Sequence, residues 1–139
     1  MKRLVGEKVH RYTLLLILLL GVAVRMVFLL QPMRYDEAFS FTHYAGKPLS
    51  LGLSDYSFPN NHLFHTLLVH FAYVTFGNQP WVIRLPALVA GILLIPASYL
   101  FVRLFYNKEA GILTAGIIAS SSILTEYSTN ARGYTLVCL

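Results

Sequence analysis

The sequence has 139 residues, of which 56% are hydrophobic and only 12% are charged, about half the charged share of a typical soluble domain. A mean hydropathy of +0.60, with the apolar residues in long blocks, excludes an ordinary soluble domain. The net charge of +5 does not indicate nucleic-acid binding, because the cations flank apolar blocks and form no stripe. Six of the eleven lie at predicted cytoplasmic ends of membrane spans: Lys2, Arg3, Lys8, Arg11, Arg103 and Lys108.

The first predicted span covers residues 13–30. A helix that crosses a bilayer needs about 20 apolar residues, and this block is just long enough. Its single charge, Arg25, lies near the outer end, where we expect the long side chain to reach the lipid headgroups. No small-residue cleavage site follows, so the segment is predicted to be an uncleaved anchor and not a signal peptide.

A polar outer loop is predicted over residues 31–61. Its first half, residues 36–44, is expected to contain a short helix, and turn residues dominate its second half, including Pro59 and the Asn60-Asn61 pair. Residues 62–76 are too short to span the membrane. At 100° per residue, His62, Thr66, His70 and Tyr73 share one face and apolar residues share the other. The pattern predicts a juxtamembrane helix in the interface, with its polar face toward water or headgroups.

Two further spans are predicted, over residues 82–104 and 110–127. The uncharged part of the second is bracketed by Arg84 and Arg103, and it follows an interfacial Trp81. The fold class is therefore all-α and polytopic, with three spans and one interfacial helix. The first twelve residues hold four Lys or Arg, against two in residues 31–80, which predicts a cytoplasmic N-terminus. Asp36, Glu37, His62 and Arg132 then share the outer side.

Asp36 and Glu37 follow the first span by about six residues. A carboxylate held at the membrane surface is partly desolvated, which suits a general base, and carboxylate oxygens also bind divalent cations. The alternative is a helix start, where acidic residues complement the helix dipole. Arg132, beyond the third span, can hold a phosphate through two hydrogen bonds or can anchor the helix end in the interface.

The histidines and tyrosines give weaker indications. His62, His65 and His70 are not accompanied by the cysteines or acids of a typical zinc site, so a metal-binding role is disfavoured. Tyr127 and Tyr134 fit first as aromatic residues at the membrane interface. No phosphate-binding loop, dinucleotide fingerprint or metalloprotease motif is present.

Four ordered motifs resemble those of membrane glycosyltransferases of the GT-C fold, closest to the bacterial group related to protein O-mannosyltransferases and lipid A aminoarabinose transferase. They are RYDEAFS at 34–40, FPNNHLF at 58–64, WVIRLPAL at 81–88 and YSTNARGY at 127–134. The resemblance covers roughly residues 13–139. Many relatives carry an acidic residue where this chain has Asn130 or Tyr134, which argues against a metal held between two loops.

The resemblance implies sugar transfer at the outer face of a plasma (inner) membrane. The donor would be a polyprenyl-phosphate sugar, carrying a hexose or a pentose, and the acceptor a lipid, glycan or protein. By analogy Asp36 is the catalytic carboxylate with Glu37 beside it, and any divalent cation would bind there. Arg34, His62, Arg132 and Tyr134 are the expected binding residues for the donor phosphate or substrate. Family members have many more spans, so the resemblance implies an N-terminal part of an enzyme that is inactive alone.

Two other functions were considered. A small three-span protein that binds or scaffolds a partner would explain the chain length better and the Asp36-Glu37 pair worse. A transporter is not supported, because the only charge within a predicted span, Arg25, lies near its end and suggests no buried ion pathway.

Overall fold

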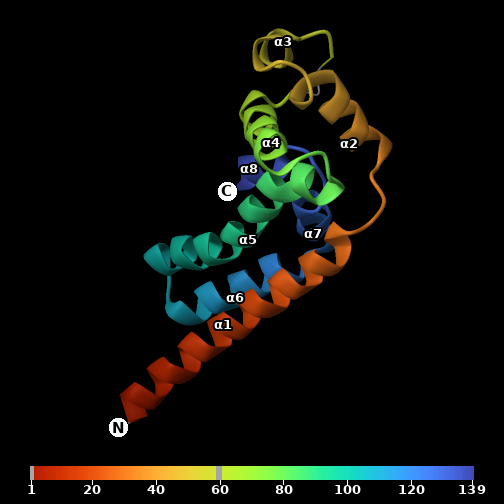
Figure 1. The fold of residues 1–139 in the computed structure, drawn as a ribbon. Coiled ribbons are helices and arrows are strands. Elements are labelled where there is room, and N and C mark those ends of the chain that lie inside the picture. Colours follow the sequence, from red (N-terminus) through yellow and green to blue (C-terminus); the bar gives the residue numbers. More distant parts are fainter. Residues whose placement is uncertain (1, 59–60) are drawn as a thin grey trace.

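The protein is a bundle of long helices with a cap of short helices at one end (Figure 1). The computed structural model describes residues 2–58 and 61–139, with side chains from residue 7 onward. Pro59 and Asn60 of the predicted outer loop, and the side chains of Lys2 and Arg3, lie outside the described residues. Helices make up 80% of the structure and the described residues form no strand, which confirms the all-α prediction.

Two helices are long and apolar enough to cross a membrane, over Glu7–Leu29 and Pro80–Phe105. The first belongs to α1 (Lys2–Leu29) and the second is α5. A third crossing results if the consecutive helices α6 (Lys108–Ser120) and α7 (Ser122–Ser128) are counted as one span. Pro86 and Pro96 lie inside α5 without ending it, as membrane helices allow. The chain is thus a multi-pass membrane protein.

The predicted third span is not one straight helix. α6 and α7 meet at a bend of 63°, whereas residues 110–127 were expected to form a continuous helix. Ser121 adopts an extended backbone conformation (φ −63°, ψ 119°), and its hydroxyl accepts a hydrogen bond from the Leu124 amide. This serine therefore ends one helix and caps the next, a role that a serine within an apolar run does not reveal.

The cap consists of elements from the outer loop and from the end of the chain. Its helices are α2 (Tyr35–Ser40), the π-helical η1 (Phe41–Ala45), α3 (Leu49–Ser54), α4 (Leu63–Phe76) and α8 (Tyr134–Cys138). The expected short helix in the first half of the loop is therefore present, as α2 and η1. Ala45, Val69, Ile83 and Ala131 form the apolar core that joins the cap to α5.

The orientation of the α4 faces differs in part from the prediction. Thr66 is buried and donates a hydrogen bond to Asn61, and the His70 ring is 2.8 Å from the Ala45 carbonyl oxygen. The polar face therefore contacts the protein and not water or headgroups, because the loop and η1 supply its hydrogen-bond partners. The apolar face is outward, with Phe71 and Val74 exposed.

Arg25 is buried. The prediction that its side chain reaches the lipid headgroups is therefore wrong. Its guanidinium donates to the Ser128 hydroxyl (3.1 Å) and to the carbonyl oxygens of Gly21 and Ala119 (3.0 and 3.3 Å). Because α6 ends at Ser120, its last carbonyls lack N–H donors within the helix. Arg25 donates to two of these carbonyls, those of Ile118 and Ala119, and so stabilises the bend.

α5 and α7 approach each other closely at Gly91. A Cβ atom at this position would lie 1.9 Å from the hydroxyl oxygen of Ser128, the residue that accepts from Arg25. We expect Gly91→Ala to lower the free energy of unfolding by about 1–3 kcal/mol through overpacking, measured by thermal unfolding in detergent. The matched control is Gly116→Ala on α6, where the nearest atom to a new Cβ is 4.0 Å away. Equal stability of the two variants would contradict the prediction.

Candidate active site

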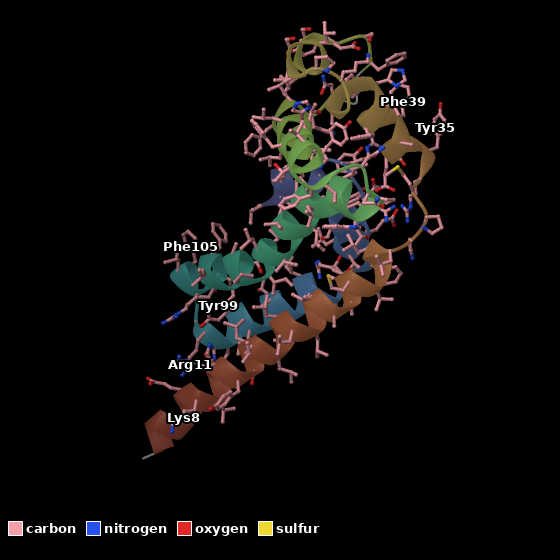
Figure 2. The ribbon with its side chains drawn as sticks, viewed as in Figure 1. Lys8, Arg11, Tyr35, Phe39, Tyr99 and Phe105 are labelled. Carbon is pink, nitrogen blue, oxygen red and sulfur yellow. The ribbon has the colours of Figure 1, made fainter. Side chains whose placement is uncertain are left out.

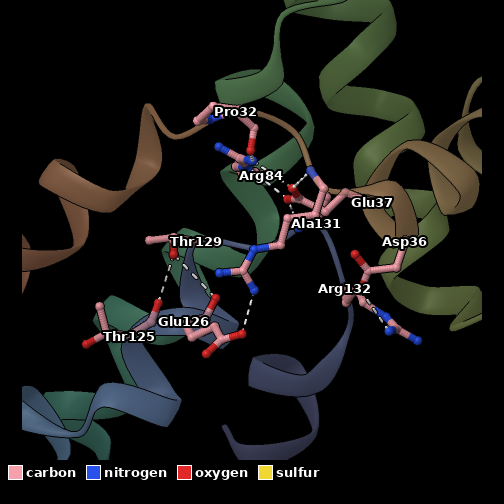
Figure 3. Close-up of polar contacts among 10 residues, drawn as sticks. Pro32, Asp36, Glu37, Arg84, Thr125, Glu126, Thr129, Ala131 and Arg132 are labelled. Atoms are coloured by element: carbon pink, nitrogen blue, oxygen red, sulfur yellow. Dashed lines mark hydrogen bonds and ion pairs between the residues drawn. The ribbon is translucent and has the colours of Figure 1, made fainter.

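The two neighbouring acids of α2 have different environments. Glu37 is completely buried, whereas the Asp36 side chain is 38% exposed. Consecutive residues on a helix point about 100° apart, so one acid can face the protein while the next stays accessible. Both contact the segment that follows α7, and Figure 3 shows Asp36 beside Arg132 and Glu37 beside Ala131.

Glu37 forms a buried ion pair with Arg84 of α5. The Arg84 Nε and Nη2 atoms donate to the two carboxylate oxygens at 2.8 and 2.6 Å. The same oxygens accept from the backbone amides of Ala131 (2.8 Å) and Arg34 (2.9 Å). Both carboxylate oxygens of Glu37 are therefore occupied by protein donors, and the residue has no exposed surface.

Arg84 uses its remaining donors on the backbone after α1. Its Nη1 atom donates to the carbonyl oxygens of Leu29 (2.6 Å) and Gln31 (2.8 Å), and Nη2 donates to that of Pro32 (3.2 Å). The pair thus joins the end of α1, α2, α5 and the segment after α7. A buried ion pair is tolerated where its hydrogen bonds are complete in this way.

Asp36 pairs with Arg132, whose Nη1 atom donates to the Asp36 carboxylate at 3.0 Å. The Arg132 guanidinium also lies over the Tyr134 ring, 4.9 Å from its centroid, and that ring is in edge contact with His62. The Arg132 side chain is 15% exposed and turned toward Asp36. Asp36, His62, Arg132 and Tyr134 of the predicted site are thus brought together.

Arg34 lies apart from that group and pairs with Glu126 of α7 (2.5 Å), with both side chains about half exposed. The hydrogen bond with Glu126 raises the pKa of Arg34 above its ordinary value. The pair lies on a cavity of about 330 Å³ between α1 and the α6–α7 bend, where the other polar lining residues are Gln31, Ser120, Ser122, Thr125 and Thr129.

The described residues do not fit a divalent cation at Asp36 and Glu37. The Glu37 oxygens accept four hydrogen bonds from Arg84, Ala131 and Arg34, and Asp36 faces the cation of Arg132. Residues 7–58 and 61–139 contain no group of three His, Cys, Asp or Glu side chains placed to hold a metal. The predicted alternative of a cation at these acids is therefore not supported by the donor set.

His62 and His65 lie at the start of α4, against Gly133. A Cβ atom on Gly133 would be 2.9 Å from the His62 Cβ atom and 3.2 Å from that of His65, so only glycine permits this approach. Burial lowers the pKa of His62, with the charge of Arg132 acting in the same direction. Burial also lowers the pKa of His65 to about 4, helped by His62. Both rings are then neutral at pH 7.

Stability should fall as the solution is acidified below pH 6.5. The unfolded chain binds a proton at His65 near pH 6.5, whereas the folded protein does so near pH 4, so protonation favours unfolding between these values. We expect a loss of about 3 kcal/mol over that window, measured by thermal unfolding at several pH values. In His65→Gln most of this pH dependence should disappear. If the variant keeps the wild-type pH profile, His65 is not its source.

Sequence reasoning missed Arg84, Glu126 and the Ala131 amide. Arg84 was interpreted as the flank of a span, although it stands one turn inside a long apolar helix. A buried arginine needs hydrogen-bond acceptors for its charged group, and an acid is a common one. Asp36 and Glu37 are two of the three acids between the first span and this one, so this position carried a usable signal. Glu126, at the polar end of an apolar run, gave no comparable indication.

Comparison with known proteins identifies a family. The family model described as dolichyl-phosphate-mannose-protein mannosyltransferase matches residues 61–139. No curated protein and no solved structure matches significantly. The matched region contains Arg84, the α6–α7 bend and Arg132, whereas Asp36 and Glu37 precede it. The chain belongs to the dolichyl-phosphate-mannose-protein mannosyltransferase family and is a membrane glycosyltransferase by that membership.

Proposed function

We propose that this chain takes part in transferring a sugar from a polyprenyl-phosphate carrier to an acceptor at the outer face of a plasma membrane, with its N-terminus in the cytoplasm. The observation that carries the proposal is the difference in environment between the two acids of α2. Asp36 is partly accessible beside an arginine, while the Glu37 carboxylate is buried and paired with Arg84. The family match favours this function over a non-enzymatic scaffold.

Asp36 acts as the general base in this proposal. Its carboxylate accepts the proton of the acceptor hydroxyl as the acceptor oxygen bonds to the anomeric carbon. The bond between that carbon and the phosphate oxygen breaks, and the polyprenyl phosphate leaves with the electron pair. Arg132, at 3.0 Å from Asp36, is close enough to stabilise the departing phosphate.

The other site residues bind and position. Tyr134 holds the guanidinium of Arg132 over its ring, and neutral His62 offers a ring nitrogen to a sugar hydroxyl. Arg34 binds donor phosphate from the rim of the 330 Å³ cavity. Its pair with Glu126 is exposed and worth at most about 1 kcal/mol, so a phosphate can displace that carboxylate.

Glu37 is assigned a positioning role in place of the catalytic role predicted from the sequence. Its burial and its contacts with Arg84 and Ala131 leave no oxygen for a substrate. By fixing α2 against the segment after α7, it sets the distance between Asp36 and Arg132.

The proposal is tested by the choice of sugar donor. The full-length gene product is purified and reconstituted in vesicles, with membrane lipids, glycans and proteins as acceptors. It is given labelled mannose, another labelled hexose or a labelled pentose, each on polyprenyl phosphate or on a nucleotide. Label should transfer from the lipid donor alone. Transfer from the nucleotide sugar at an equal rate, or none from polyprenyl-linked hexoses and pentoses, would overturn the assignment.

A further inference from the structure

A second polar cavity lies at the other end of the spans, the end that carries the N-terminus. Its volume is about 230 Å³, and it is formed where α1, the end of α5 and the start of α6 meet. Figure 2 shows Arg11 and Tyr99 at this end of the bundle. The lining residues are Glu7, His10, Arg11, Tyr99, Arg103 and Lys108.

Three cations converge on this cavity from three helices. Arg11 comes from α1, Arg103 from α5 and Lys108 from α6, and all three are exposed. No ion pair among the described side chains engages any of them, and Glu7 is the only anion in the lining. The wall thus carries two more positive than negative charges, which favours an anionic occupant.

The floor of the cavity is ordered. Tyr99 is 5% exposed, and its hydroxyl is 2.7 Å from the His10 ring nitrogen. Gly111 of α6 approaches the Tyr99 ring so closely that an added Cβ would lie 2.8 Å from it. The tyrosine is therefore fixed between two helices, and the three cations surround a rigid polar base and not a deformable surface.

An apolar groove adjoins the cavity and shares Arg11 with it. This groove, of about 250 Å³, lies between α1 and α5, and its other lining residues are Leu14, Leu15, Leu18, Ile95 and Pro96. It extends from the cationic cavity toward the middle of the spans, because residues 14–18 follow Arg11 along α1. A cationic cavity continued by an apolar groove matches a phosphate head with an acyl chain.

We propose that this cavity and groove bind one anionic glycerophospholipid, with its phosphate between Arg11, Arg103 and Lys108 and one acyl chain along Leu14, Leu15 and Leu18. Two arginines can each donate paired hydrogen bonds to phosphate oxygens, and basic pockets between membrane helices are a common setting for anionic lipids. The site is at the opposite end of the spans from Asp36, so the inference does not rest on the proposed glycosyltransferase function.

The test is lipid retention by the full-length protein in native mass spectrometry. Delipidated protein is titrated with phosphatidylglycerol or with phosphatidylcholine of the same chains. Wild type should bind one phosphatidylglycerol at least about tenfold more tightly than phosphatidylcholine. The variant Arg11→Gln/Arg103→Gln/Lys108→Gln should lose this preference, whereas Lys47→Gln, which removes one cation from the cap, should keep it. Equal affinity of wild type for both lipids overturns the proposal.

Two further variants distinguish a loss of lipid contacts from a disturbance of membrane insertion. Neutralising flanking cations can disturb membrane insertion, so Arg11→Lys/Arg103→Lys retains the charge and should still weaken binding through the loss of paired hydrogen bonds. Leu15→Trp narrows the groove without removing a positive charge, and should weaken binding of the lipid. If neither changes retention, or if soluble glycerol phosphate displaces the lipid at similar concentration, the lipid assignment is wrong.

Discussion

Replacing Asp36 with asparagine should reduce the rate of sugar transfer by about 10²- to 10⁴-fold, the usual contribution of a general base. Asparagine keeps the size of the side chain but cannot accept the acceptor's proton. The effect should be on kcat and not on donor binding, because Arg132 and Tyr134 are unchanged. The measurement is the initial rate of label transfer from the polyprenyl-linked sugar by the full-length protein.

The control for this variant is Asp55→Asn. Asp55 is also an aspartate of the outer loop, paired with Lys47 and bonded to Ser57, but it has no contact with Arg132. This substitution should leave the rate within about twofold, because it removes no group from the reacting centre. Loss of the partly exposed Asp36–Arg132 pair costs at most about 1 kcal/mol of stability, so Asp36→Asn should fold normally. A folded Asp36→Asn protein with wild-type activity rules out the base.

Breaking the Glu37–Arg84 pair should have the largest effect on stability. In Arg84→Met, the buried Glu37 carboxylate loses its cation and the carbonyls of Leu29 and Gln31 lose their donors. We expect a loss of about 3–5 kcal/mol in the free energy of unfolding, measured by thermal or denaturant unfolding in detergent. Glu37→Leu should cost a similar amount, since it leaves Arg84 and the Ala131 amide without their acceptor.

The double variant Glu37→Leu/Arg84→Met tests how much of the stability loss in each single variant comes from leaving an unpaired charge buried. It should be less damaging than the sum of the two single variants, because no unpaired charge remains buried. Recovery should be incomplete, since the backbone groups after α1 and at Ala131 stay unsatisfied. Arg34→Met, which breaks an exposed pair, is the matched control and should change stability by less than about 1 kcal/mol. Additive effects in the double variant would show that the two residues are not coupled.

The sequence predicted the elements well and their contacts poorly. Apolar blocks and turn residues located the membrane helices, the helix in the outer loop and α4, because each depends on local pattern. The bend at Ser121 was missed because a single serine within an apolar run is compatible with a straight helix. The environments of Arg25 and Arg84 were missed because their partners lie 103 and 47 residues away.

For the candidate site, too, the sequence predicted the residues better than their contacts. The motifs indicated Asp36 and Arg132, and the structure brings them within hydrogen-bonding distance. The sequence could not tell which of two adjacent acids is buried and which stays accessible, because that depends on the rotation of α2. The rotation is set by Arg84 on another helix, so the roles of Asp36 and Glu37 separate only once the fold is known.

The contacts of α2 have a consequence for biosynthesis. Asp36 meets Arg132 and Glu37 meets Ala131, so two consecutive residues pair with two consecutive residues more than 90 positions later. During synthesis the acids leave the ribosome early and remain without these partners until the third hydrophobic segment has been inserted. The proposed catalytic carboxylate therefore reaches its arginine partner late, after the three hydrophobic segments of this sequence have been synthesised.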